Sequence, residues 1–369
     1  MRVQVVDPPA YTPPYDRSLC AALARAGADV ELITSRFVHG PVPAPLGYEV
    51  REAFYRYSGR RDASAPARRA VKLAEHVADM LRYRRSGAAV DIRHFQWLPV
   101  PAVDTRLLPP GRPRVFTAHG LLRSEGWDRR LRGLRRVLDR MDAVVALSEF
   151  GRERLASTGL DAGRIKVIPH GAFDYLTHQP EEAPLPPELA AVAGPVILFF
   201  GLIRPYKGVD VLIDAFRSVK DAELWIVGRP LGVSLDDLRE AAAAAPGRVR
   251  FVPRFVSDQE LPAYFRRADV VALPHRDAEQ SGVLFAALAF GKAIVMSDVG
   301  GFGEVAATGA GALAPPGDAP ALGSRLQELV DNSTERERLA AAAAAAASGP
   351  YSWELVARQT LDLYRELGA

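Results

Sequence analysis

The segment from Val196 to Phe216 reads VILFFGLIRPYKGVDVLIDAF and predicts a strand, a tight loop and a helix. Val196–Phe200 is an unbroken apolar run, which is typical of a strand in a parallel sheet covered on both faces. Apolar residues then recur at helical spacing from Val209 onward. The loop carries Arg204 and Lys207, and a basic loop at the carboxyl end of a parallel strand favours phosphate binding, because free N–H groups and fixed cations meet there. The alternative is that both cations are solvated charges beside an ordinary turn.

Strand and helix patterns alternate through both halves of the chain. The alternation runs from Val3 to His170, stops in the proline-rich segment 179–195, and restarts at Val196. Two successive patterns of this kind predict an α/β protein with two doubly wound, Rossmann-like lobes facing across a cleft. We expect an amino-terminal lobe at 1–178, a linker at 179–195 and a carboxyl-terminal lobe at 196–351. The predicted strands are 3–6, 30–34, 89–95, 114–117, 143–146, 196–200, 223–227, 249–252, 270–273 and 293–297, and the predicted helices are 15–26, 63–85, 131–140, 209–216, 340–347 and 352–367.

Composition and termini exclude several classes of protein. The single cysteine, Cys20, cannot form an internal disulfide, and its place in the apolar pattern LCAALA predicts a buried helix residue rather than a nucleophile. Met1 leads directly into a strand-like run, and no later segment approaches the roughly 20 apolar residues of a membrane span. We therefore expect a cytoplasmic protein that is neither exported nor integral to a membrane.

Charge is distributed unevenly along the chain. The first 175 residues carry 29 Lys and Arg against 19 Asp and Glu, whereas the remainder carries 18 against 25. Much of the excess lies in the segments 60–85 and 123–140, where apolar residues are interleaved with arginine. Such segments can lie on anionic lipid headgroups, so one interpretation is peripheral contact with the inner face of a membrane. The other is a solvated, arginine-rich surface. No nucleic-acid-binding module is present, and we expect no nucleic-acid partner.

Two further loops bear on function. The first connection, DPPAYTPPYD, is rich in proline, which removes N–H donors, so we expect this loop to shape a wall of the acceptor side rather than cradle an anion. The second is EQSGVLFAALAFG, in which Ser281 and Gly282 precede a predicted helix. The first amides of that helix, on Gly282, Val283 and Leu284, have no partner within the helix and are expected to form a phosphate site. The alternative is that Ser281 is only an N-cap.

A family resemblance runs through these motifs in order. FFGLIRPYKGVDVLIDAF and ADVVALPHRDAEQSGVLFAALAFGKAIVMSDVGGFGEV in the second half, with FTAHG, LSEFG and VIPHG in the first, resemble the family 4 glycosyltransferases. These are retaining enzymes of the GT-B fold that use nucleotide-sugar donors. The resemblance implies that the final helix, 352–369, crosses back to the first lobe. It also implies a sugar transfer from a nucleotide-diphosphate sugar to a hydroxyl group.

The resemblance implies roles for individual residues. Lys207 matches the family lysine that contacts the pyrophosphate. The family arginine stands where this chain has Leu202, and Arg204, two residues later, is assigned the same role. His119, in FTAHG, matches the family histidine near the anomeric carbon, where it would position groups while the leaving phosphate deprotonates the acceptor; the alternative is a structural histidine. The implied catalytic residues are His119, Arg204 and Lys207, and the implied donor-binding residues are Gly201, Arg204, Lys207, Phe255, Val256, Glu279, Ser281, Gly282, Val283, Leu284 and Glu304.

The sequence departs from the family at one pair of positions. Most members carry two glutamates, eight residues apart, where this chain has Ala278 and Ala286. Glu279 and Asp277 flank the first position, and nothing near the second replaces its carboxylate. The contacts to the donor sugar hydroxyls are therefore expected to differ from those of relatives.

We interpret the chain as a retaining glycosyltransferase that uses a UDP- or GDP-sugar and a glycan, lipid-linked or small-molecule acceptor. No further cofactor is expected, and the histidines lack the spacing of a metal site. The two missing acids keep open an inactive nucleotide-sugar-binding partner subunit, and an epimerase of the same fold is a third hypothesis. A nicotinamide dehydrogenase is disfavoured, because no G-x-G-x-x-G follows a strand.

Overall fold

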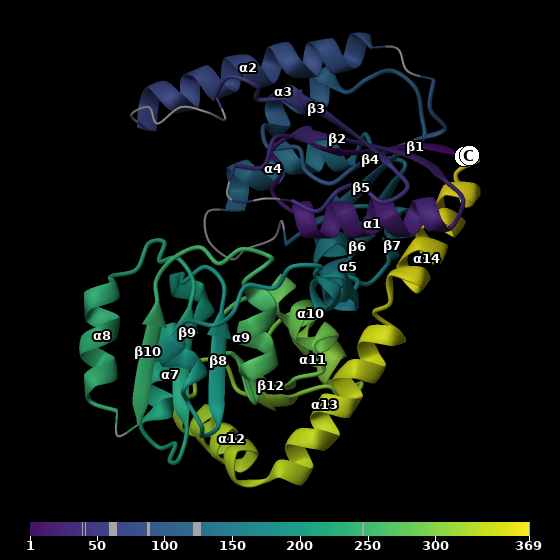
Figure 1. Cartoon of the computed structure of the whole chain (residues 1–369). Helices are drawn as coiled ribbons and strands as arrows, with labels where there is room; N and C mark the ends of the chain where they lie inside the picture. Colours follow the sequence, from purple (N-terminus) through teal and green to yellow (C-terminus); the bar gives the residue numbers. More distant parts are fainter. Residues whose placement is uncertain are drawn as a thin grey trace. The chain divides into compact units, whose positions relative to one another are not determined.

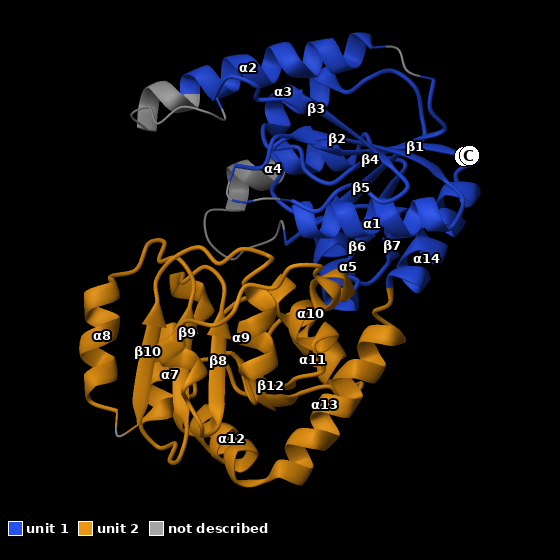
Figure 2. Cartoon of the chain, in the orientation of Figure 1, with its two compact units in different colours: residues 1–171, 353–369 blue, residues 172–352 orange. Residues whose placement is uncertain are grey.

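The computed structural model describes residues 1–369 except 39, 41, 59–64, 87–88, 121–126, 246 and 369, and it describes the backbone alone at 65–69 and 127–132. The chain divides into two compact units, coloured separately in Figure 2. Unit 1 comprises Met1–Gly171 and Trp353–Ala369, and unit 2 comprises Ala172–Ser352. The segment 179–195 lies within unit 2.

Unit 1 is built on a parallel sheet of seven strands in the order β3-β2-β1-β4-β5-β6-β7 (Figure 1). Short buried runs such as RVQVVD and AVVA form its central strands because helices cover both faces. Its strands are β1 (Arg2–Asp7), β2 (Asp29–Ser35), β3 (Glu49–Phe54), β4 (Ile92–Phe95), β5 (Arg114–Ala118), β6 (Ala143–Ala146) and β7 (Ile165–Val167). Its helices are α1 (Pro13–Arg25), α2 (Ala65–Arg85), α3 (Pro101–Leu107), α4 (Trp127–Leu138), α5 (Glu149–Ser157), the short η2 (Ala162–Arg164) and α14 (Trp353–Glu366).

The final helix, α14, packs on the sheet of unit 1 beside α1. The Tyr364 hydroxyl lies 2.7 Å from His94 Nδ1, and His94 Nε2 lies 2.7 Å from the Thr117 hydroxyl. Trp353, at the start of the helix, packs edge-on against Tyr15 of α1 with ring centroids 5.3 Å apart. Buried polar pairs of this kind are directional, so they set the position of α14 as well as stabilising it. The expected return of the final helix to the first lobe is confirmed.

Unit 2 contains a parallel sheet of six strands in the order β10-β9-β8-β11-β12-β13 (Figure 1). Its strands are β8 (Val196–Phe200), β9 (Glu223–Val227), β10 (Arg248–Val252), β11 (Val270–Leu273), β12 (Ala293–Ser297) and β13 (Ala312–Ala314). Its helices are η3 (Asp174–His178), α6 (Pro187–Ala190), η4 (Pro205–Lys207), α7 (Val209–Phe216), α8 (Leu235–Ala243), α9 (Leu261–Arg267), α10 (Gly282–Ala289), α11 (Phe302–Ala306), α12 (Ala319–Asp331) and α13 (Ser333–Ser348).

Helices cover both faces of this second sheet. Apolar side chains of α7, α8 and α12 pack on one face and form a continuous buried cluster with β8, β9, β11 and β12. On the other face, Phe265 of α9 lies against Phe200 of β8, and Phe290, after α10, stacks on Phe265. By itself, the sequence of the alanine run Ala340–Ala347 in α13 predicts a plain surface helix, because alanine has the best helix propensity and no functional group. That prediction is wrong for Ala343 and Ala346, which are buried because α13 packs against α10 and β12.

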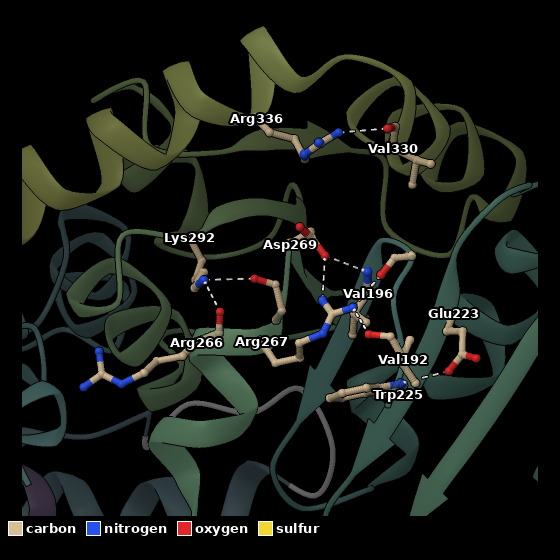
Figure 3. A network of polar contacts seen from close by, with 12 residues as sticks. Val192, Val196, Glu223, Trp225, Arg266, Arg267, Asp269, Lys292, Val330 and Arg336 are labelled. Atoms are coloured by element: carbon tan, nitrogen blue, oxygen red, sulfur yellow. Dashed lines mark hydrogen bonds and ion pairs between the residues drawn. The ribbon is translucent and has the colours of Figure 1, made fainter. Parts of the chain in front are cut away.

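A polar network fastens the amino ends of the central strands in unit 2 (Figure 3). The Asp269 carboxylate accepts a 2.8 Å hydrogen bond from the Val196 N–H and pairs with Arg267 at 3.2 Å. Arg267 also donates to the carbonyls of Val192 and Gly194, at 2.8 and 2.6 Å. The end of the proline-rich segment is therefore bonded to the strand edge that lies opposite the ligand-binding edge of a parallel sheet.

Most strand predictions are confirmed within a residue or two. β3, β7 and β13 were not predicted, and β4 is three residues shorter than expected at its amino end. β3, an edge strand, reads EVREAF and buries only Phe54, so the alternation of apolar and polar residues that marks a strand is weak there. Cys20 is buried in α1, as predicted.

Candidate functional site

The topological switch point of unit 2 lies between β8 and β11. The chain moves outward from β8 through β9 to β10, and then returns to the other side of β8 with β11. Connections from β8 and β11 therefore leave in opposite directions, and this is the point at which doubly wound sheets bind ligands. Both loops that the sequence marked as anion-binding, 201–208 and 274–281, leave from these two strands.

Direct contacts join the two loops. Gly208 has a φ of 65°, and a Cβ at this residue would overlap the carbonyl oxygen of Pro274. The Arg276 N–H donates to the Tyr206 carbonyl at 2.7 Å, while the Arg276 guanidinium holds Asp210 with two bonds of 2.6 and 2.7 Å. The left-handed backbone and the close approach both require glycine at position 208. The pair of Arg276 and Asp210 was not predicted, because no local pattern links residues so far apart in the chain.

Lys207 reaches back to the end of β8. It is 9% exposed, and its Nζ lies 3.4 Å from the point that a Cβ on Gly201 would occupy. Val283, in the first turn of α10, places a methyl group 3.2 Å from the same point. The ammonium group is therefore brought to the switch point beside a helix amino terminus, where fixed positive charge favours an anion.

The amino terminus of α10 differs in one respect from expectation. Ser281 is 7% exposed and makes no side-chain cap, and its Oγ has no hydrogen-bond partner among the described residues. The Leu284 N–H donates to the Ser281 carbonyl at 2.9 Å, so the prediction of an unpaired amide is wrong for Leu284. The helix begins with a 3₁₀ turn, so the Leu284 amide, which would be unpaired at an α-helical start, is already hydrogen-bonded within the helix. The amides expected to face a ligand are thus those of Gly282 and Val283.

Arg204 occupies a different environment from Lys207. It immediately precedes η4, and its carbonyl accepts the Lys207 N–H at 3.0 Å. The side chain is half-buried, and its Nε has no hydrogen-bond partner in the described part of the chain. The structure thus places Arg204 in the same loop as Lys207, and its role as a second phosphate contact stays a prediction.

The two alanine positions are buried. Ala278 is 6% exposed and Ala286 is 3% exposed. A Cβ on Gly300 would overlap the Ala278 carbonyl, and the Glu279 carbonyl accepts the Gly301 N–H at 3.1 Å. This packing anchors the loop that carries Glu279 to the turn before α11. The Glu279 side chain is half-buried at that loop.

The remaining predicted donor residues follow β10 and β12 of the same sheet. Phe255 is 43% exposed and Val256 is buried, and both follow β10, two strands from β8. The Phe255 carbonyl accepts a 3.0 Å hydrogen bond from Arg254, which shows that the turn is held by its own side chain. Glu304 lies in α11, where its charge, second to burial, raises the pKa of Tyr351 to about 12. These residues share the carboxyl edge of one sheet.

His119 follows β5 in unit 1 and is surrounded by rings. Its Nε2 lies 2.8 Å from Gln96 Oε1, its ring stacks on Trp97 at 5.5 Å, and the Tyr15 ring meets it edge-on at 4.6 Å. Burial, followed by the neighbouring His170 and His94, holds the pKa of His119 well below its usual range. The imidazole is therefore neutral at pH 7, so it can accept or donate a hydrogen bond without carrying charge.

Sequence reasoning missed the polar residues around His119. Gln96 directly follows β4 and Asp7 ends β1, so both stand at the same sheet edge as His119. The signal was present, since a polar residue at the carboxyl end of a buried parallel strand is a candidate ligand contact. Among the described residues, no group of three or more His, Cys, Asp or Glu is placed to hold a metal ion.

Two parallel doubly wound sheets, with a lysine and a helix amino terminus at the switch point of the second, are the architecture of the GT-B fold. A solved structure shares this fold across both units. The chain aligns over its full length with Anabaena HepE in complex with UDP-glucose, at a TM-score of 0.75 and 21% identity, covering 100% of each chain.

Sequence comparison identifies the family. Residues 17–172 match the model for Glycosyltransferase Family 4, and residues 194–332 match that for Glycosyl transferases group 1. The chain belongs to the family 4 glycosyltransferases, which are enzymes.

Two relatives illustrate the range of similarity. A phosphatidyl-myo-inositol mannosyltransferase of Mycobacterium leprae is 35% identical over 60% of this chain, and the match spans 58% of that protein's length. A D-inositol 3-phosphate glycosyltransferase of Nocardioides sp. is 28% identical over 96% of this chain and 85% of that protein.

Proposed function

We propose that this protein transfers a sugar, with retention at the anomeric carbon, from a UDP- or GDP-sugar to an acceptor hydroxyl. In this reaction the bond between the anomeric carbon and the diphosphate oxygen breaks. A bond to the acceptor oxygen forms on the same face of the sugar. The acceptor proton passes to the leaving diphosphate, so Lys207 and the α10 amides have to stabilise the charge that develops on that group.

The observation that carries the proposal is the position of the Lys207 ammonium. It lies at the end of β8 beside the first turn of α10, which is where a diphosphate on this sheet would meet both a cation and helix N–H groups. The UDP-glucose named for the HepE structure and the mannosyl transfer named for the Mycobacterium leprae relative are consistent with a nucleotide-sugar donor. His119, neutral beside Gln96, would position the acceptor hydroxyl.

Calorimetric titration with UDP, GDP and ADP tests the donor directly. We expect one nucleoside diphosphate to bind, and Lys207→Ala to weaken that binding and to lower turnover by roughly 100-fold, as loss of one charge-assisted contact in an occluded site would. Lys220→Ala is the matched control, because Lys220 is an exposed lysine of the same unit. Equal diphosphate affinity in Lys207→Ala and Lys220→Ala would refute the proposal.

One observation supports a second candidate function. The buried positions Ala278 and Ala286 offer no carboxylate for the donor sugar, as expected for a partner subunit that binds a nucleotide sugar without turning it over. Diphosphate binding that depends on Lys207, together with no turnover on any donor and acceptor tested, would favour that alternative. Turnover of a nucleotide sugar in the absence of an acceptor, with epimeric product, would favour an epimerase.

We also propose that the protein works in the cytoplasm and makes peripheral contact with the inner face of a membrane. α2 exposes Val71 and Leu73 in its first half and ends in a basic last turn, although much of the two basic segments, including Arg60 and Arg123, lies outside the described residues. None of the described helices combines the length and apolar character of a membrane span. Sedimentation with anionic and neutral vesicles tests this contact, and equal partitioning to both would contradict it.

A further inference from the structure

A second topological switch point lies in unit 1, between β1 and β4. The chain moves from β1 to β2 and β3 on one side, and β4 then pairs with the other side of β1. Val6 of β1 stands in register with Phe95 of β4, so the next residues, Asp7 and Gln96, stand level with each other at the carboxyl ends of the two strands. Polar side chains thus occupy the point at which a doubly wound sheet binds its ligand.

Asp7, Gln96 and His119 lie on one face of this sheet, under α1. Gln96 pairs with His119, whose ring packs against Tyr15 of α1. Asp7 is linked to Asp16, which also belongs to α1, through Thr12, because the Thr12 N–H donates to Asp7 and the Thr12 hydroxyl donates to Asp16. The three polar side chains therefore form one group rather than three separate sites.

Each of two buried residues in this group has an atom without a partner. Asp7 and Gln96 are both 0% exposed, and neither Asp7 Oδ1 nor Gln96 Nε2 has a hydrogen-bond partner among the described residues. Burying a polar atom without a hydrogen-bond partner is costly, so such atoms are rare outside sites that bind something. An amide N–H donates and a carboxyl oxygen accepts, which together match the donor and acceptor capacity of hydroxyl groups.

An aromatic residue follows each of these two residues closely in the chain, Tyr11 after Asp7 and Trp97 after Gln96. Tyr11, in the proline-rich loop after β1, is 57% exposed and meets Trp97 edge-on, with ring centroids 5.4 Å apart. Trp97 is held in turn by its stacking on His119 and by a 3.0 Å hydrogen bond from Nε1 to the Thr12 hydroxyl. Ala10, just before Tyr11, has a φ of 50°, a conformation rare for alanine that presents the tyrosine. An exposed, positioned ring beside hydrogen-bonding groups suits the apolar face of a sugar or cyclitol.

Among the residues that the structure describes, the charge at this place disfavours an anionic ligand. Asp7 and Asp16 are both buried, and burial raises the pKa of Asp7 to about 6 and that of Asp16 well above its usual range. The pair is held by Thr12, whose N–H bonds Asp7 at 3.3 Å and whose hydroxyl bonds Asp16 at 3.3 Å. Arg17, the next residue on α1, directs its guanidinium to the Pro43 carbonyl at 2.7 Å. A phosphate placed here would face carboxyl oxygens, with like charges in a buried site.

We propose that Asp7 and Gln96, with the Tyr11 ring beside them, bind the acceptor of this enzyme, and that the acceptor is an uncharged ring with neighbouring hydroxyl groups. The proposal rests on the proposed function, because it names the class of molecule that receives the sugar. It also separates this protein from relatives named for D-inositol 3-phosphate, whose acceptor carries a phosphate.

The first test compares uncharged and phosphorylated ligands on the wild-type protein without a donor. Saturation-transfer NMR would use myo-inositol, mannose and glucose, each beside its monophosphate. We expect at least one uncharged ring to bind, and its monophosphate to bind at least 10-fold more weakly. Tighter binding of the monophosphates would overturn the proposal, and so would the absence of binding by every uncharged ring.

The second test uses Gln96→Leu, which removes the amide at nearly constant volume. We expect the KM for the uncharged acceptor to rise at least 10-fold while the affinity for the nucleoside diphosphate, which unit 2 binds, stays within twofold of wild type. Gln359→Leu is the matched control, a half-buried glutamine of α14 in the same unit. An unchanged acceptor KM in Gln96→Leu would mean that the Gln96 amide faces only water, and would overturn the proposal.

The two proposals fail in different ways. If no nucleoside diphosphate binds, the proposed function is wrong, yet ring binding that is lost in Gln96→Leu would still establish the site in unit 1. If nucleotide-sugar turnover occurs but favours phosphorylated acceptors, the proposed function stands and the acceptor assignment is wrong. Should Gln96→Leu not fold, Gln96→Glu serves instead, because a carboxylate in place of the amide adds negative charge and should also weaken ring binding.

Discussion

At the scale of single residues, the contrast between Lys207 and Ala286 describes the site best. Lys207 presents a cation at a place where the backbone already favours an anion, whereas Ala286 presents nothing to a ligand. Both side chains are close to fully buried. The site is therefore well suited to a diphosphate, and we expect weaker discrimination among donor sugars than in relatives that carry a carboxylate at this point.

Ala286→Glu tests whether a carboxylate is missed at this position. Ala286 lies inside α10 between buried Phe285 and Ala287, so we expect the new carboxyl to lower stability by about 2–4 kcal/mol without raising kcat/KM. Ala289→Glu, at a half-exposed position on the same helix, is the control for helix propensity and charge. Thermal unfolding and kinetics over hexose and 6-deoxyhexose donors give the answer. A large gain in activity in Ala286→Glu would contradict this prediction. Strict selectivity of the wild type for one fully hydroxylated hexose would also contradict it.

At the scale of elements, the loops after β8 and β11 pack directly against each other, because Gly208 has no side chain to keep them apart. Gly208→Ala places a Cβ against the Pro274 carbonyl, so we expect a loss of roughly 3 kcal/mol or more in stability and weaker diphosphate binding, since Lys207 is adjacent. Gly317→Ala provides the control. Gly317 has a similar φ of 78°, but no atom lies within 4 Å of the position that a Cβ would occupy. The Gly317→Ala variant should therefore lose only about 1 kcal/mol of stability, which is the cost of placing alanine in a left-handed backbone conformation. Chemical denaturation measures the loss of stability in both variants. Equal losses would show that the contact with Pro274 does not affect stability.

The helix α14 gives a second prediction at this scale. Tyr364→Phe removes the hydroxyl that pairs with buried His94, and we expect a loss of about 1–2 kcal/mol in the stability of unit 1. Tyr57→Phe, at a tyrosine that is 72% exposed in the same unit, should be nearly neutral. Denaturant titration of both variants compares them. If Tyr364→Phe is as stable as Tyr57→Phe, the His94 pair does not fasten the final helix.

At the scale of the whole molecule, buried histidines predict a loss of stability in acid. Burial lowers the pKa of His94 to about 3 and that of His170 to about 4, so the folded state keeps both neutral while the unfolded state binds protons near pH 6.5. Their contribution is fully present above that pH and is lost progressively as the pH falls toward 4. Asp7 works in the opposite direction, because its pKa is raised to about 6 and the folded state gains a proton first.

We expect the two histidines to outweigh Asp7. Relative to pH 7.5, each of the two buried imidazoles lowers the free energy of unfolding at pH 5 by about 2 kcal/mol, whereas Asp7 raises it by about 1.4 kcal/mol. The melting temperature should therefore be lower at pH 5 than at pH 7.5. Asp7→Asn removes the opposing carboxyl and should enlarge the difference. Differential scanning calorimetry at the two pH values measures both effects. A melting temperature that is unchanged or higher at pH 5 would contradict this reading of the histidines.

Periodicity and local chemistry were sufficient to predict the fold and one half of the candidate site. The runs that form β8, β11 and β12 are apolar enough to mark buried parallel strands, and their alternation with helical patterns implies two doubly wound sheets. The loop with Lys207 and the turn before α10 could be marked for the same reason, because a basic loop and a Ser-Gly pair before an apolar helix are both local features. The edge strands β3 and β13 escaped, since they bury few side chains.

Tertiary structure alone brought together residues that no local pattern connects. Asp7, Gln96 and His119 are separated along the chain by the windings of a doubly wound sheet, and only the order β1-β4-β5 makes their strand ends neighbours. In the same way, the contact of Gly208 with Pro274 and the burial of Ala286 depend on the pairing of β8 with β11. Sequence specifies each strand and each loop by short-range chemistry. Which strand ends meet is decided by strand order, because crossover connections place side by side strands that are distant in sequence.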